Sequence, residues 1–87
     1  MKYICLDLEN ETDIAEVHEI FKTMLDFPDY YGDNYNALYD ELTSVSDDIE
    51  INLIVKEEDL DKWETLRRVL SEAAGENAHI VLRGKIM

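Results

Sequence analysis

The sequence contains few of the residues on which catalytic and metal sites depend. Its 87 residues include one cysteine, two histidines and three glycines. A nucleophile–base pair needs a serine or cysteine beside a histidine, yet no motif surrounds His79, and His18 is expected on the flank of a helix. There is no CxxC or HExxH pattern, no calcium loop and no glycine-rich phosphate loop. We therefore predict no catalytic residue, no metal site and no cofactor.

The single cysteine, Cys5, excludes an intrachain disulfide. It lies in an apolar run, which favours a buried and unreactive core thiol. One unpaired thiol also fits a reducing compartment. No stretch approaches membrane-spanning length, and Asp7 and Glu9 interrupt the first apolar run too early for a signal peptide. We therefore expect a cytoplasmic protein.

Positive charge is scarce as well. Eight lysines and arginines stand against 21 aspartates and glutamates, which gives a net charge of −13. Phosphate groups would repel such a chain, so nucleic acids and anionic membranes are disfavoured as partners. An acidic surface can serve solubility alone, but it also speeds association with a cationic partner at low salt. The charge by itself leaves both interpretations open.

Apolar residues alternate with other residues in three segments, which predicts strands over residues 2–8, 49–56 and 78–84. Helical patterns separate these segments. Strands separated by helices pair in parallel through right-handed crossovers. We expect one α/β domain over residues 1–87, with a three-stranded parallel β-sheet packed against three to four helices.

The helical patterns have recognisable ends. The first follows a cap at Thr12 or Asp13 and stops before Pro28. A second, short helix is expected over about residues 34–43. A long pattern covers residues 57–75, and the glycine at its end is the expected stop. Its apolar residues, together with those of the first helix, should form the core.

Residues 27–42, FPDYYGDNYNALYDEL, concentrate tyrosines and acidic residues. At 100° per residue, the second helix has one narrow apolar face for the core. A second face carries Asn36 and Asp40, and Tyr39 stands where the two faces meet. Asp40 lies two turns into the helix, where neither capping nor the helix dipole accounts for a carboxylate. Gly32 is expected to turn the backbone sharply before this helix.

This stretch resembles the signature of barstar-type ribonuclease inhibitors, roughly PxYYGxNxxALxDxL. The matching residues are Pro28, Tyr30, Tyr31, Gly32, Asn34, Ala37, Leu38, Asp40 and Leu42. The resemblance implies a barstar-like fold without catalytic activity. It also implies that the second helix and the preceding loop plug the cationic active site of a ribonuclease, where a carboxylate imitates RNA phosphate.

The resemblance extends to individual positions. Asp40 corresponds to the central carboxylate, Glu72 to a second acidic contact, and Tyr39 stands where the family commonly has tryptophan. Asn36 departs from the pattern, because barstar has an aspartate there. The implied partner-binding residues are Tyr30, Tyr31, Gly32, Asn34, Asn36, Ala37, Tyr39, Asp40, Thr43 and Glu72.

Three functional hypotheses follow. The first is an intracellular inhibitor of a secreted guanyl-preferring microbial ribonuclease, acting as a monomer in a 1:1 complex with a basic, barnase-like enzyme. The second is a non-inhibitory barstar-like binding or immunity module for another basic protein or toxin, which the amide at Asn36 keeps open. The third is a small metal-assisted hydrolase built from Asp33, Asp40 and Glu72, with no histidine placed to help.

Overall fold

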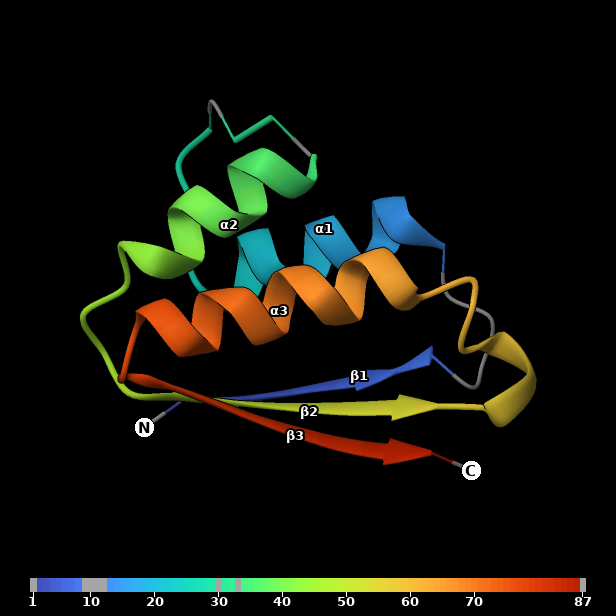
Figure 1. The fold of residues 1–87 in the computed structure, drawn as a ribbon. Helices are drawn as coiled ribbons and strands as arrows, with labels where there is room; N and C mark the ends of the chain where they lie inside the picture. Colours follow the sequence, from blue (N-terminus) through green and yellow to red (C-terminus); the bar gives the residue numbers. More distant parts are fainter. Residues whose placement is uncertain (1, 9–12, 30, 33, 87) are drawn as a thin grey trace.

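The computed structural model describes residues 2–8, 13–29, 31–32 and 34–86. Its elements are β1 (Lys2–Asp7), α1 (Ile14–Met24), α2 (Tyr35–Thr43), β2 (Ile49–Val55), the 3-10 helix η2 (Glu57–Asp59), α3 (Glu64–Glu76) and β3 (Ile80–Ile86). The strands form one sheet in the order β1-β2-β3, and both strand pairs are parallel (Figure 1). The predicted three-stranded parallel α/β fold is therefore confirmed.

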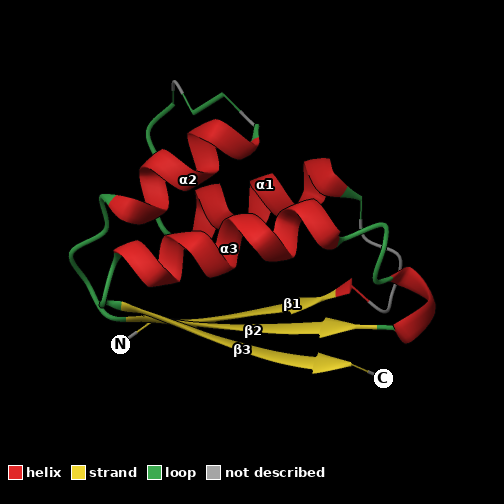
Figure 2. Cartoon of the chain, in the orientation of Figure 1, coloured by secondary structure: helices red, strands yellow, loops and turns green. Residues whose placement is uncertain are grey.

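All three described α-helices lie on one side of this sheet (Figure 2). The strands alternate accordingly: every second residue of β2, from Ile49 to Val55, is buried, and the residues between are only half-buried. Ile4, Ile51 and Leu82 share one row of the register on the helix-covered face. The apolar residues of the sheet and the helices thus form a single core between the two layers.

Helix α1 begins and ends where its sequence requires. Asp13 is the N-cap, and its carboxylate accepts a hydrogen bond of 2.9 Å from the backbone N–H of Glu16. The alternative cap, Thr12, lies outside the described residues. The helix stops at Met24, and Asp26 then takes a left-handed φ of 56° before Pro28. Aspartate tolerates that conformation better than most residues, so the turn needs no glycine.

The long helical pattern over residues 57–75 differs from the observed structure at both ends. Its first part forms only η2 and a turn, because the aspartates favour turns and the chain must pass from the sheet layer into the helix layer. Trp63 then enters the core, with 2% of its surface exposed. At the other end α3 continues through Gly75, and the stop is Asn77, whose backbone is extended. No described glycine has a positive φ.

The prediction of a buried core thiol at Cys5 is wrong. The side chain is exposed. Neighbouring residues of a strand face opposite sides of the sheet, so Ile4 and Leu6 reach the core while Cys5 does not. Cys5 lies instead on the face that none of the described helices covers, which we call the open face of the sheet.

Candidate partner-binding surface

The start of α2 is fixed by its own loop. Asn34 is the N-cap, and its Oδ1 accepts a hydrogen bond of 2.8 Å from the backbone N–H of Ala37. Its amide nitrogen donates to the carbonyl of Gly32 at 3.3 Å. A Cβ on Gly32 would lie 2.9 Å from that nitrogen. Gly32 therefore makes room for the capping side chain, and its φ is not positive.

The loop before α2 also contacts α1 through the buried side chain of Tyr31. Tyr31 is 7% exposed, and its ring packs 4.9 Å from that of Phe27. Its hydroxyl forms a short hydrogen bond with Nδ1 of His18, which is itself buried. His18 thus lies in the interior, contrary to the expectation of a helix flank. Because its side chain is buried, Tyr31 stabilises the loop from the interior and leaves little surface for contact with a partner.

Helix α2 divides into the two predicted faces. Leu38 and Leu42 are fully buried, while Asn36 and Asp40 are exposed. Tyr39 is half-buried at the boundary. Ala37 and Thr43 are half-buried as well. The Thr43 hydroxyl donates to the carbonyls of Tyr39 and Asp40, at 2.9 and 3.1 Å, so it is committed to its own helix.

Three carboxylates act electrostatically on Tyr39. The pKa of Tyr39 is raised, first by loss of solvent and then by the negative charges of Glu76, Glu72 and Asp40. Since α2 packs against α3, side chains from both helices act on one phenol. We call Tyr39, Asp40, Glu72 and Glu76 the acidic surface. It joins the predicted residues Asp40 and Glu72 across two helices.

Glu76 is the residue that the sequence interpretation missed. It stands four positions after Glu72, and residues four apart lie on the same side of a helix. That spacing could have identified it, once Glu72 had been selected. The two salt bridges among the described residues, His79–Asp48 and Arg83–Glu50, involve none of these three carboxylates.

Some of the predicted residues cannot be placed. Tyr30 and Asp33 lie outside the described residues, so their part in the candidate surface remains a prediction. Within the part of the chain that is described, no group of three histidine, cysteine or acidic side chains is arranged to hold a metal ion. In the same residues, every helix is too short or too polar to cross a bilayer.

Comparison with known proteins connects this geometry to a family. A model of the family described as "Barstar (barnase inhibitor)" matches residues 1–84. A protein named "Putative ribonuclease inhibitor YrdF", from Bacillus subtilis (strain 168), is 41% identical to the chain over 56 residues. That match covers 64% of this chain and 60% of the relative, so less than two thirds of the relative's length is represented.

Proposed function

The chain belongs to the barstar family, and from this premise we propose that it inhibits a secreted, guanyl-preferring ribonuclease by closing the enzyme's active site. A site that binds RNA must be cationic to hold phosphate. The acidic surface offers carboxylates in place of those phosphates, and charge-assisted hydrogen bonds from arginine or lysine would hold them. The observation that carries the proposal is that Asp40, Glu72 and Glu76 are exposed carboxylates on two helices that pack together, and that all three act on Tyr39.

Each part of the surface has a distinct role in this proposal. Asp40 is the central phosphate mimic, because it is exposed and lies in the last turn of α2, where it cannot cap the helix and the helix dipole does not favour a carboxylate. Tyr39 provides an aromatic ring beside it, a combination typical of interface hot spots. Ala37 has a small side chain, so the partner can approach the helix closely at this position. Asn36 adds an exposed amide that can accept or donate a hydrogen bond.

The proposal also covers the loop and the wider setting. Gly32 and Asn34 hold the loop in shape, and Tyr30 is proposed to flank the contact. We propose further that the protein is not an enzyme, acts in the cytoplasm of the producing cell, and forms a 1:1 complex as a monomer. The net charge of −13 supports fast capture of a basic enzyme.

Titration into a microbial guanyl-type ribonuclease tests the proposal. RNA cleavage should fall linearly and reach zero at one inhibitor per enzyme. Association should be slower at about 150 mM than at about 10 mM ionic strength, because the Debye length shrinks from about 30 Å to about 8 Å. Undiminished cleavage in the presence of excess protein would overturn the proposal.

A second candidate function rests on Asn36. This exposed residue is neutral where barstar has a carboxylate, so the charge pattern could fit another basic protein or toxin. Such a module would bind its target tightly without stopping RNA cleavage. The same titration, run with other basic proteins as competitors, separates the two functions.

A further inference from the structure

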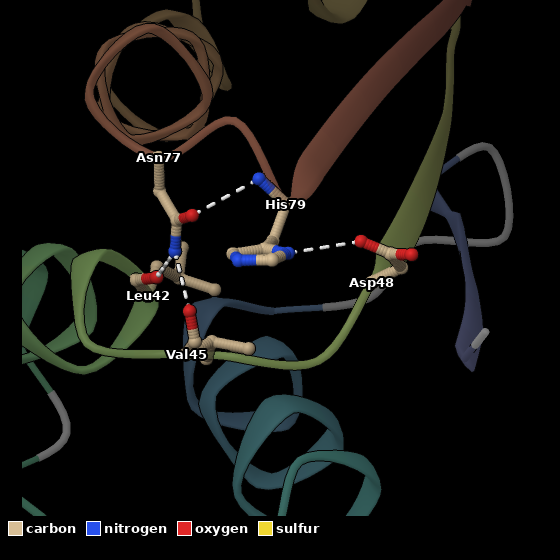
Figure 3. Close-up of polar contacts among 5 residues, drawn as sticks. All are labelled: Leu42, Val45, Asp48, Asn77 and His79. Atoms are coloured by element: carbon tan, nitrogen blue, oxygen red, sulfur yellow. Dashed lines mark hydrogen bonds and ion pairs between the residues drawn. The ribbon is translucent and has the colours of Figure 1, made fainter.

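Asn77 lies between the ends of the two helices that carry the acidic surface (Figure 3). Its side chain is 8% exposed and makes three hydrogen bonds. The amide nitrogen donates to the carbonyl oxygens of Leu42 at 3.0 Å and Val45 at 2.8 Å. The amide oxygen accepts from the backbone N–H of His79 at 3.0 Å. Its capacity for hydrogen bonding is therefore used on three different parts of the backbone.

Through these contacts the residue at the end of α3 hydrogen-bonds the end of α2. The last four carbonyls of an α-helix have no N–H donor within their own helix, and Leu42 belongs to the last turn of α2. The Leu42 carbonyl accepts from the backbone N–H of Val45 at 3.3 Å, and Asn77 adds a second, shorter hydrogen bond to it. The N–H of Asn77 itself donates to the carbonyl of Ala73 at 2.9 Å. One residue thus terminates α3 and caps α2, although 35 positions separate it from Leu42.

Asn77 also connects both helices to the sheet. His79, whose backbone N–H donates to Asn77, pairs through Nδ1 with Asp48 at 2.9 Å (Figure 3). The carbonyl of Asp48 accepts from the N–H of Lys2, and the carbonyl of His79 accepts from Ile49. These bonds lie where all three strands begin. The end of α2 is therefore fixed to α3 and, through His79, to the start of the sheet.

We propose that Asn77 is a positioning residue for partner binding: it holds α2 against α3 so that Asp40 stays beside Glu72 and Glu76. This inference rests on the proposed function, because it concerns the same surface. A partner that needs all three carboxylates together binds only the fraction of molecules in which the helices are correctly placed. Affinity falls in proportion to that fraction, and a rigid surface avoids the loss.

Two variants with the same added charge test the proposal against simple electrostatics. Asn77→Asp keeps the shape and the acceptor for His79, but it cannot donate to the carbonyls of Leu42 and Val45. Ala78→Asp adds the same charge at an exposed neighbouring position. Charge alone would speed the association of both variants with a cationic ribonuclease. We expect Asn77→Asp to associate about tenfold more slowly than Ala78→Asp, with similar dissociation rates. Equal association rates would overturn the proposal.

A second measurement needs no partner. Because the carboxylates of α3 help to raise the pKa of Tyr39, movement of α2 away from α3 should lower it. We expect the Tyr39 ring to titrate at lower pH in Asn77→Ala than in the wild type, as followed by NMR with Tyr39→Phe for assignment. Amide exchange should also become faster over residues 41–45. An unchanged Tyr39 titration would overturn the positioning role.

The two measurements separate the inference from the proposed function. If the wild type does not bind the ribonuclease but Asn77→Ala shifts the Tyr39 titration, the proposed function fails and the control of helix position stands. If the wild type binds and neither Asn77 variant differs from its reference, the inference fails alone. Global unfolding of Asn77→Ala, seen by circular dichroism, would also overturn it, since Asn77 would then serve the whole fold.

Discussion

The helical side of the molecule and the open face of the sheet differ in whether their carboxylates are paired with a cation. On the open face, Arg83 Nε donates to Glu50 at 2.8 Å, and Asn52 donates to the other oxygen at 3.2 Å. The hydrogen bond from Arg83 is the main reason why the pKa of Glu50 is lowered, and the bond from Asn52 adds to it. On the helical side, Asp40 and Glu72 have no cationic partner among the described residues.

This difference shows where a foreign cation would be bound. A carboxylate that already has an arginine has little left to gain from a second one. A carboxylate whose neighbours are other carboxylates gains most from an incoming cation. Total charge alone could not have distinguished the two faces, so the placement of the few arginines and lysines is as informative as the excess of acids.

The largest expected effect is on binding. Asp40→Ala should weaken the complex with the cognate ribonuclease by about 3–5 kcal/mol, the usual cost of removing one partner from a buried ion pair. Glu50→Gln on the open face is the matched control, because it removes the same charge far from the proposed contact. Its free energy of binding should stay within about 0.5 kcal/mol of the wild-type value, in the range of a distant surface change. Isothermal titration calorimetry gives both values.

Equal losses from the two variants would show that net charge governs association. The distinction between the two faces would then have no role in binding.

The next effect concerns stability. Leu42→Ala should lower the free energy of unfolding by about 2–5 kcal/mol, because Leu42 is fully buried on the core face of α2. Val81 on the open face is 38% exposed, so Val81→Ala should cost less than about 1 kcal/mol. Urea unfolding followed by circular dichroism measures both. Similar losses would mean that the open face is covered in solution.

A smaller effect is expected where a single hydroxyl is removed. Tyr31→Phe deletes the hydrogen bond to His18 but keeps the ring contact with Phe27, so it should lower the free energy of unfolding by about 1 kcal/mol. Tyr3→Phe is the control on the open face, where Tyr3 is 62% exposed. It should leave the urea midpoint unchanged. A Tyr31→Phe variant as stable as the wild type would show that the loop needs no such anchor.

The smallest effect is a change in acid sensitivity. The folded-state pKa of Glu50 lies below its ordinary value of 4.5, so its stabilising contribution is present above pH 4.5 and is lost as pH falls through the folded pKa. Arg83→Gln removes the main cause of that shift. Its free energy of unfolding should therefore decrease less between about pH 5 and about pH 3 than that of the wild type. Identical slopes would show that the pair does not act in solution.

The sheet and the short helix could be predicted because local patterns determine them. Strand alternation predicted the buried residues of β2, and the angular spacing of 100° per residue predicted the two faces of α2. The Asp13 cap was predictable for the same reason. In each case, residues only two to four positions apart decide the outcome.

The errors arose where distant parts of the chain decide the structure. Nothing near Cys5 indicates that the described helices leave its side of the sheet open. The side chain of Asn77, where α3 stops, bonds the carbonyls of Leu42 in α2 and of Val45 just after it, and these are more than thirty residues away. The burial of His18 depends on Tyr31 in the same way. Tertiary contacts of this kind have no local sequence pattern.

The long separation between Leu42 and Asn77 has a consequence for protein synthesis. Residues 35–43 leave the ribosome well before residue 77, so the carbonyls of Leu42 and Val45 lack their hydrogen bonds from Asn77 until that residue has been made. At about 5–20 residues per second, the interval is roughly 2–7 s. During that time β3 is also missing, and β2 has only β1 to pair with. A nascent chain therefore carries the residues of α2 before it can present them in their final arrangement.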